Sequence, residues 1–273
     1  MRLYIRKTIY QKCSFAKITN SLSAASINNV IGKRFIELLS VDSTNNYAMQ
    51  QVKNGTAING DVYFAFEQTA GKGQRNKKWL SVRSNNIIMS AVIDTRELLI
   101  NQQFILNMAA ALSARELFNK YTTKQIKIKW PNDIYSNDRK AAGILIENII
   151  RGKKWQFAII GFGININQMV FSDTLKNPVS LKQITGKNYN VIKLAKQLCS
   201  LLNKNLTHLF SGNENFILNN YNEQLYKRNE IVKFKQGSII FSALVKAVNN
   251  SGRLIVDTGI EKAFESGTLE WIH

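Results

Sequence analysis

The sequence predicts an α/β protein, more closely described as α+β, that is built in two parts. Helix patterns alternate with strand patterns from Lys33 to Lys227, whereas only short strand patterns and turns follow Lys227. The length of 273 residues exceeds one average domain and falls short of two. We therefore predict a mixed, mostly antiparallel sheet flanked by helices over residues 32–227, and a small barrel-like β-domain over residues 228–273.

Residues 1–31 differ from the rest of the chain. They carry no acidic residue and end in the Ser/Ala/Asn-rich run SLSAASINN; their basic residues are Arg2, Arg6, Lys7, Lys12 and Lys17. An organellar transit peptide has this composition. We favour a disordered tail or a start codon chosen too far upstream. The segment is shorter than a winged-helix domain of ~60 residues, so no DNA-binding domain of that kind is expected.

The first half of the larger part is expected to begin with a strand and a helix. The alternation of RFIELLSV (34–41) predicts a half-buried strand. Ser43 or Thr44 then caps a predicted helix that runs to Val52 and ends near Gly55. Residues 61–68 and 86–93 are predicted strands on either side of a glycine-rich segment. An amphipathic helix is predicted over 101–120 from apolar residues near helical spacing: Phe104, Met108, Leu112 and Leu117.

The second half predicts a strand at 126–130, a hairpin of 140–150 with 154–166, and helices at 192–210 and 214–225. Beyond a boundary near Arg228, short strands are expected in EIVKF (230–234), IIFSALVKAV (239–248), RLIVDT (253–258) and TLEWI (268–272). Asn250-Ser251-Gly252 lies between two alternating runs, which is a hairpin signal.

Composition narrows the class of protein. Apolar residues make up 45% of the chain, with 14 Phe, 9 Tyr and 4 Trp, which is ample for a packed core. The two cysteines, Cys13 and Cys199, are far apart, so a reducing, cytoplasmic compartment is expected. Two histidines argue against a protein-built transition-metal site. No run reaches the ~18 consecutive apolar residues that a spanning helix needs, so no membrane partner is expected.

The formal charge of +19 has two explanations. A basic surface supplies the electrostatic part of nucleic-acid binding. Lys, Asn and Ile are all abundant here, however, which is also the mark of a biased genome composition. The lysines are scattered along the chain and no nucleic-acid motif accompanies them, so no specific DNA partner is expected.

Two motifs indicate chemistry. Residues 66–79, FEQTAGKGQRNKKW, combine two glycines with four Lys/Arg, the composition of a loop that surrounds a phosphate with backbone N–H groups and cations. Residues 129–133, KWPND, place Asp133 after an apolar strand and a rigid Trp-Pro corner. A phosphate loop together with one fixed carboxylate predicts nucleotide-dependent group transfer. The simpler explanations are a solvated basic turn and an Asx residue capping a turn.

Six segments together resemble the biotin–protein ligases. They are STNNYAM (43–49), FEQTAGKGQRNKKW (66–79), NNIIMS (85–90), KWPNDIY (129–135), RKAAGILIE (139–147) and GFGININ (161–167). The resemblance runs from about residue 34 to the C-terminus and also includes SGRLIVDT and TLEWI. It implies a class II synthetase-like sheet with a C-terminal SH3-like β-barrel, in a monofunctional ligase without the DNA-binding domain.

The resemblance also implies a reaction in two steps. The biotin carboxylate attacks the α-phosphate of ATP to give biotinyl-5′-AMP and pyrophosphate, and a lysine of a biotin carboxyl carrier domain then displaces AMP. ATP and biotin are the implied substrates, and Mg²⁺ accompanies ATP, held by phosphate oxygens, water and one or two protein oxygens. The implied partner is the carrier domain of acetyl-CoA carboxylase or a related carboxylase, and a homodimer is left open.

The glycine-rich loop matches the family's adenylate-binding loop at Gly71, Lys72, Gly73, Gln74 and Arg75. Glycine permits close backbone approach, while Lys72 and Arg75 offset the charge of the phosphate and of the leaving pyrophosphate. Many relatives have arginine at positions 72 and 74. Lysine lacks the bidentate fork of arginine, so Lys72 is expected to contact phosphate with a different geometry, and Gln74 carries no charge.

The remaining site residues follow from the same resemblance. Lys140 contacts the biotin carboxylate and the α-phosphate and is the first catalytic candidate; Asp133 faces the acceptor lysine and takes or stabilises its proton. Ser43, Thr44 and Asn45 would hydrogen-bond biotin together with Gln68, although Ser-Thr-Asn is also an ordinary helix cap. Trp130 would wall the adenine or position the loop. Lesser roles near the nucleotide are implied for Asn132, Gly143 and Asn165.

Three other functions stay open from the sequence. A lipoate–protein ligase shares the fold and also adenylates a cofactor carboxylate. A basic nucleic-acid-binding protein with a decayed site would explain the charge. A weak biotin binder would explain Gln74, and Asn76 where relatives commonly have glycine.

Overall fold

The computed structural model describes residues 30–272, so the expectations for residues 1–29 lie outside the described range. Up to residue 223 the chain contains both strands and helices: β1 (Phe35–Leu38), α1 (Thr44–Lys53), β2 (Val62–Ala65), β3 (Ile87–Asp94), α2 (Gln103–Asn119), β4 (Ile126–Lys129), β5 (Asp133–Ser136), β6 (Arg139–Arg151), β7 (Lys154–Ile164), α3 (Leu181–Thr185), α4 (Val191–Phe210) and α5 (Glu214–Glu223). Short 3₁₀ turns occupy Gln74–Asn76 (η1) and Ile100–Gln102 (η2).

The first seven strands form one sheet in the order β1-β2-β3-β7-β6-β5-β4. The β1–β2 pair is parallel and the other pairs of this sheet are antiparallel. This arrangement confirms the predicted mixed, mostly antiparallel sheet. A parallel pair needs a crossover connection, and α1 supplies it between β1 and β2.

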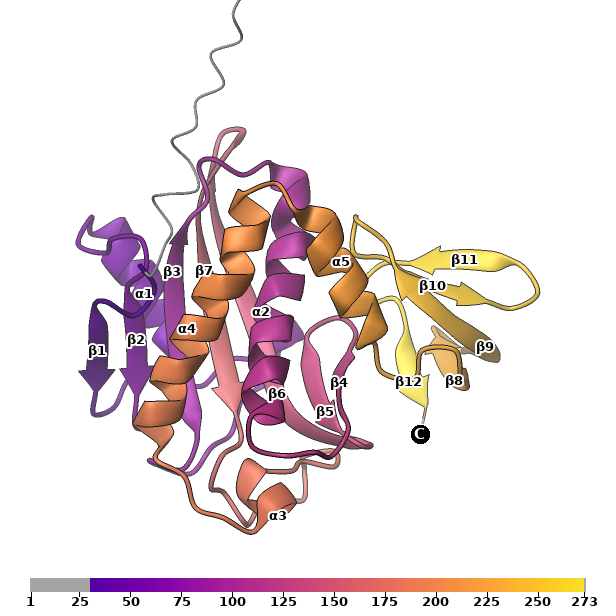
Figure 1. Cartoon of the computed structure of the whole chain (residues 1–273), viewed down its shortest axis with the longest axis horizontal. Coiled ribbons are helices and arrows are strands. Elements are labelled where there is room, and N and C mark those ends of the chain that lie inside the picture. Colours follow the sequence, from indigo (N-terminus) through magenta and orange to yellow (C-terminus); the bar gives the residue numbers. More distant parts are fainter. Residues whose placement is uncertain (1–29, 273) are drawn as a thin grey trace, which may run out of the picture.

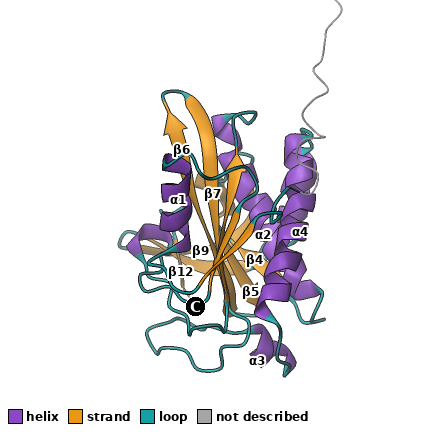
Figure 2. Cartoon of the chain, turned by 90° about the vertical axis from the view of Figure 1, so that its left-hand side faces the viewer, coloured by secondary structure: helices purple, strands orange, loops and turns teal. Residues whose placement is uncertain are grey.

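The two faces of this sheet are covered differently (Figures 1 and 2). Helices α2 and α4 pack on one face, where the large core contains Ile160, Phe162 and Ile164 of β7. On the other face α1 covers β2, β3 and one end of β7, and its core is smaller. Because side chains alternate along a strand, Gly161 and Gly163 lie on this second face, beside α1. Part of that face is therefore left for a site.

The C-terminal strands form a second sheet, antiparallel and in the order β11-β10-β9-β8-β12. They are β8 (Ile231–Gln236), β9 (Ile239–Val248), β10 (Leu254–Asp257), β11 (Glu261–Phe264) and β12 (Glu270–Ile272). Its hairpin turn at 249–252 is fixed to the larger part: Trp130 Nε1 donates to the Gly252 carbonyl over 2.9 Å, and Gly252 lies against the Phe104 ring. The expected C-terminal β-structure is thus confirmed as a five-stranded antiparallel sheet, and the domain boundary near Arg228 stays a prediction.

The described chain starts on the helical face. Ile31 exchanges two hydrogen bonds with the Asn203 side chain of α4, at 3.0 and 3.1 Å, and Gly32 lies against Cys199 of the same helix. No helix within residues 30–272 is long and apolar enough to cross a membrane.

Candidate active site

A cavity of about 880 Å³ opens on the sheet face that carries α1 and extends beneath the edge of the C-terminal sheet. It is lined by almost every residue that the sequence singled out: Ser43, Thr44, Asn45, Gln68, Lys72, Gly73, Gln74, Arg75, Trp130, Asn132, Asp133, Lys140, Gly143 and Asn165. Gly71 lies just behind this lining, packed against the Trp79 carbonyl and the Gln68 amide. Segments spread over 120 residues therefore meet in one place.

Polar groups form one end of the cavity, at the N-terminus of α1. The Thr44 amide and hydroxyl both donate to Gln68 Oε1, at 2.7 and 3.1 Å. Ser90 of β3 lies within hydrogen-bond distance of Thr44 Oγ1 and Asn45 Oδ1, at 2.8 and 2.6 Å. Asn45 Nδ2 donates to Glu147 of β6 over 2.8 Å. The network fixes these amides and hydroxyls in place and makes this end of the cavity polar.

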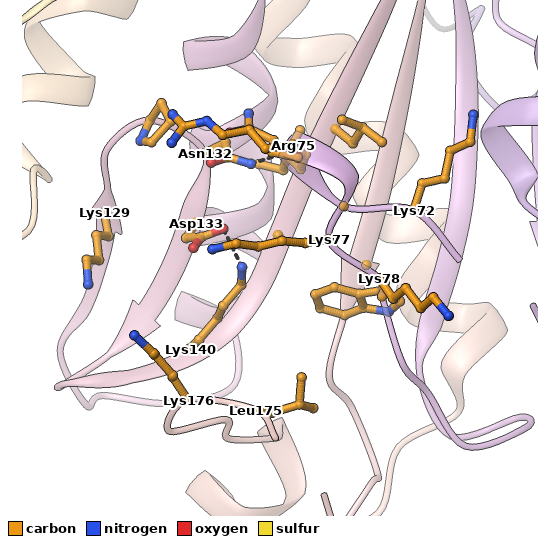
Figure 3. Close-up of a pocket in the computed structure, with 18 of the residues that line it drawn as sticks. Lys72, Arg75, Lys77, Lys78, Lys129, Asn132, Asp133, Lys140, Leu175 and Lys176 are labelled. Atoms are coloured by element: carbon orange, nitrogen blue, oxygen red, sulfur yellow. Dashed lines mark hydrogen bonds and ion pairs between the residues drawn. The ribbon is translucent and has the colours of Figure 1, made fainter. Parts of the chain in front are cut away.

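The predicted phosphate loop crosses the cavity with its two expected cations engaged by protein groups. Lys72 Nζ lies 3.6 Å from Glu147, and Figure 3 shows its side chain directed away from the Lys140–Asp133 pair. Arg75 takes a left-handed conformation, with φ 54°, and donates to the Gly267 carbonyl of the C-terminal sheet over 3.3 Å. Both contacts are partly exposed and therefore contribute little to holding the two cations in place.

The centre of the cavity holds the two predicted catalytic residues side by side (Figure 3). Lys140 Nζ lies 2.7 Å from Asp133 Oδ1, and both side chains are about one-quarter to one-third exposed. Lys140 stands near the start of β6 and Asp133 begins β5, which pairs with β6 in antiparallel register. The simpler explanation of Asp133 as the cap of a turn is wrong, because Asp133 is the first residue of β5, a strand that was not predicted.

Trp79 is a site residue that sequence analysis did not single out. The strand register aligns Ile88, Gly163, Gly143 and Asp133 in one row across β3, β7, β6 and β5. The Trp79 indole lies over the two glycines, and a side chain at Gly163 would overlap the ring. The ring also lies 6.0 Å from Lys140 Nζ. The alternating glycines of GFG were the available signal, because glycine in a strand marks close approach of another group.

Lys129, the last residue of β4, lies beneath the C-terminal sheet and was given no role from the sequence. It is 7% exposed, and its Nζ lies 4.6 Å from the Tyr135 ring centre, 5.4 Å from that of Trp271 and 5.5 Å from that of Tyr226. Burial lowers the pKa of Lys129 to about 8, with Lys140 and Lys176 adding to the effect and Asp133 and Asp138 opposing it. A desolvated ammonium is therefore held at this end of the cavity.

Three predicted residues serve mainly as supports in this structure. Trp130 is 2% exposed and its indole N–H is used by Gly252. Asn132 Nδ2 donates to the Ile144 carbonyl over 2.6 Å, and Asn165 Nδ2 donates to the Val179 carbonyl over 3.2 Å. These bonds fix the loops around the cavity, and a direct contact with nucleotide stays a prediction.

The charge of the cavity lining is strongly positive. Eight lining residues are Lys or Arg: Lys72, Arg75, Lys77, Lys78, Lys129, Lys140, Lys176 and Lys235. Three are acidic, and each has a protein partner: Asp133 pairs with Lys140, Asp138 with the Tyr226 hydroxyl, and Glu270 with Lys176. Such a lining favours a polyanionic ligand.

Comparison with known proteins finds relatives among protein ligases. Residues 38–165 match the model of the Biotin/lipoate A/B protein ligase family. The chain is 33% identical over 161 residues to the bifunctional ligase/repressor BirA of Bacillus subtilis, covering 58% of this chain and 49% of that protein. It is 29% identical over 129 residues to the biotin–[acetyl-CoA-carboxylase] ligase of Mycobacterium tuberculosis, covering 46% and 47%. The chain spans about half the length of these curated relatives.

Solved structures show the same fold. The biotin protein ligase of Aquifex aeolicus in complex with biotin and ATP superposes with a TM-score of 0.75 at 24% identity, covering 88% of this chain and 99% of that one. The ligase of Leishmania major with biotinyl-5-AMP gives a TM-score of 0.59 at 21% identity over 88% and 99% of the two chains.

Proposed function

We propose that the chain is an ATP-dependent ligase that attaches biotin to a lysine of a carrier domain, because residues 38–165 match the model of the Biotin/lipoate A/B protein ligase family. The observation that supports it most directly is the Lys140–Asp133 pair. The pair lies between a neutral polar end, suited to the biotin ring, and a cationic end, suited to phosphates.

The first step joins the two substrates. A carboxylate oxygen of biotin attacks the α-phosphorus of ATP, the bond from that phosphorus to the bridging oxygen of the β-phosphate breaks, and pyrophosphate leaves. Lys140 stabilises the negative charge that gathers on the α-phosphate oxygens in the transition state. Lys72 and Arg75 exchange Glu147 and Gly267 for phosphate oxygens as the loop closes, and closure keeps water from the anhydride.

The second step transfers biotin to protein. The ε-amine of the acceptor lysine attacks the biotinyl carbonyl carbon, the bond to the phosphate oxygen breaks, and AMP leaves. The attacking amine must be neutral, so one proton has to be taken up. We propose that Asp133 takes up this proton once Lys140 turns to the adenylate phosphate, because its carboxylate then loses its 2.7 Å partner.

Magnesium is proposed to enter as part of the ATP substrate. The acids that line the cavity are each engaged by a protein partner, and within residues 30–272 no three His, Cys, Asp or Glu side chains form a metal cluster. Phosphate oxygens and water would hold the ion together with one or two protein oxygens, as is usual for Mg²⁺ with nucleotides.

The proposed acceptor is the biotin carboxyl carrier domain of acetyl-CoA carboxylase or a related carboxylase. Two curated relatives are named for this substrate, those of M. tuberculosis and Paracoccus denitrificans. Lipoate is the closest alternative to biotin, because the family includes lipoate ligases. The homodimer and the absence of a specific DNA site stay predictions.

The test is a single-turnover reaction of the protein with ATP labelled at the α-phosphate, Mg²⁺, and either biotin or lipoate. We expect biotinyl-adenylate and no lipoyl-adenylate. Lys140→Ala should lower the rate by about 100-fold or more, the usual loss when one preorganised charge on a transition state is removed. Lys154→Ala, in an exposed position at the start of β7, is the matched control. Folded protein that adenylates neither acid would refute the proposal.

A further inference from the structure

Glu147 of β6 joins the polar end of the cavity to the predicted phosphate loop. Its Oε2 accepts a hydrogen bond from Asn45 Nδ2 over 2.8 Å, and its Oε1 lies 3.6 Å from Lys72 Nζ. Asn45 belongs to the first turn of α1, and Lys72 belongs to the loop. Glu147 itself is not part of the cavity lining, whereas both of its partners are. Each of its carboxylate oxygens is therefore engaged by a site residue.

The Asn45 side chain holds Glu147 in one orientation. Asn45 Nδ2 also donates to the Leu145 carbonyl over 3.3 Å, and Asn45 Oδ1 lies 2.6 Å from Ser90 Oγ. Asn45 is 3% exposed and lies against Gly161 of β7, where a side chain would overlap its amide. A buried amide with this many partners has little freedom to turn. The Glu147 carboxylate is therefore fixed from the side of the polar network.

Lys72 is the more exposed partner of the ion pair. Its side chain is 43% exposed, against 32% for Glu147, and Figure 3 shows it directed away from the Lys140–Asp133 pair. Within residues 30–272, Glu147 is the one carboxylate at ion-pair distance from its ammonium. Because of this direction, Lys72 has to leave Glu147 in order to reach a phosphate that reacts at Lys140. A carboxylate and a phosphate are both strong acceptors for an ammonium, so the two compete.

We propose that Glu147 is a positioning residue that acts through Lys72 and weakens the binding of ATP and pyrophosphate, because it competes with them for the Lys72 ammonium. The proposal rests on the function proposed above. Each polyphosphate that binds has to displace Glu147 from Lys72, and Glu147 takes the ammonium back when pyrophosphate leaves. A ligand shifts such an equilibrium only by its preference for one of the two arrangements, so the carboxylate lowers the apparent affinity for phosphate.

Isothermal titration with inorganic pyrophosphate tests this inference without turnover. Glu147→Gln keeps an acceptor for Asn45 and removes the negative charge that faces Lys72. We expect this variant to bind pyrophosphate and ATP about two- to five-fold more tightly than wild type, the range for one partly exposed ion pair, and to bind biotin near wild type. Glu147→Asp draws the carboxylate back by one methylene and should give a smaller gain. A side chain that only supports the fold would give a loss.

The matched control is Glu67→Gln. It makes the same chemical change at an acid that pairs with Arg83 over 3.8 Å, and neither residue of that pair lines the cavity. Pyrophosphate binding should stay near wild type in this variant. An equal gain for Glu67→Gln and Glu147→Gln would mean that the net charge of the protein sets the affinity, which would overturn the inference.

A double-mutant cycle identifies the residue through which Glu147 acts. Lys72→Met removes the ammonium and should weaken pyrophosphate binding. In that background Glu147→Gln should have no further effect, because the two carboxylate-dependent arrangements no longer exist. If Glu147→Gln raises the affinity equally with and without Lys72, the carboxylate repels phosphate directly, and the inference is wrong.

Failure of this inference can be told from failure of the ligase function. If adenylate forms from biotin while Glu147→Gln binds pyrophosphate no more tightly than wild type, the inference is overturned and the function stands. If Glu147→Gln gains affinity only in the presence of Lys72 but no adenylate forms, the competition stands and the ligase function fails. Wild type and variants that all fail to bind pyrophosphate would also overturn the inference.

Discussion

The contact between Lys140 and Asp133 joins two groups that the proposed reaction needs apart. Their 2.7 Å ion pair is partly exposed, and pairs of that kind contribute only about 0–1 kcal/mol to stability. The ion pair therefore matters more for positioning the two side chains in the cavity than for the stability of the fold. In the absence of phosphate it keeps a cation and a carboxylate side by side, and an anionic intermediate at Lys140 would release Asp133 for the second step.

Asp133→Asn should separate the two steps. The amide keeps the shape of the carboxylate but takes up no proton, so transfer from supplied biotinyl-adenylate to a carrier domain should slow by about 100-fold. Adenylate formation should change less, because Lys140 retains its charge. Rapid-quench measurement of each half-reaction checks this. Asp257→Asn, in β10 of the C-terminal sheet, controls for the loss of an acidic side chain. Equal slowing of both steps would contradict the assignment.

Single residues were predicted well where they stand in a recognisable sequence motif. They were predicted poorly where their role depends on contacts between distant parts of the chain. Lys140, Asp133 and the Thr44–Gln68 pair stand in recognisable segments, and they do meet in one cavity. The position of Lys129 among three aromatic rings was not predictable, because two of the rings, those of Tyr226 and Trp271, come from the far end of the chain. No local sequence pattern predicts such a long-range contact.

At the scale of elements, the loop of residues 71–79 is fixed to the sheet by one ring. Trp79 lies across Gly163 of β7 and Gly143 of β6, which are cross-strand partners. Missing side chains at both positions create the flat surface that the indole occupies. The end of the loop is therefore anchored, while Lys72 and Arg75 nearer its middle are held only by weak, partly exposed contacts.

Replacing either glycine with alanine should destabilise the protein, and Gly163→Ala should do so more than Gly143→Ala. Gly163→Ala would overlap the Trp79 ring, so we expect unfolding free energy to fall by about 1–3 kcal/mol and adenylate formation to fall with it. Gly143→Ala meets Trp79, Asp133 and Lys140 at 3.3–3.4 Å and should cost less. Urea unfolding and near-ultraviolet circular dichroism measure both effects. A larger loss for Gly143→Ala would contradict this account of the loop.

Long elements were predictable because their pattern repeats often enough to be recognised. The hairpin of β6 and β7 and the helices α2 and α4 all lie where the sequence placed them. The short elements β5, β11 and α3 were missed, since four or five residues carry too few periods to distinguish a strand or helix from a loop. The missed β5 is the one that supplies Asp133.

At the scale of the whole molecule, the net charge of +19 bears on how a partner arrives. Cations are concentrated in the cavity lining as well as scattered along the chain. A basic surface accelerates encounter with an acidic carrier domain by long-range attraction, and salt screens this attraction.

Acceptor kinetics should therefore depend on salt. As ionic strength rises from about 0.01 M to about 0.15 M, the screening length shrinks from about 30 Å to about 8 Å. We expect kcat/KM for an acidic carrier domain to fall by about ten-fold or more, with little change in kcat, because steering acts on encounter. A carrier domain whose surface acids are replaced by amides is the control and should lose this dependence. Salt-insensitive kcat/KM for the acidic carrier would refute the proposal.

The attachment of Ile31 to Asn203 decides where other proteins can be joined to this one. The described chain enters on the face covered by α2 and α4, and the cavity opens on the opposite face. A fusion partner, an affinity label or a solid support joined directly to Val30 would therefore start on the face opposite the cavity. The C-terminus offers no such freedom, because β12 places Glu270 and Trp271 in the cavity wall.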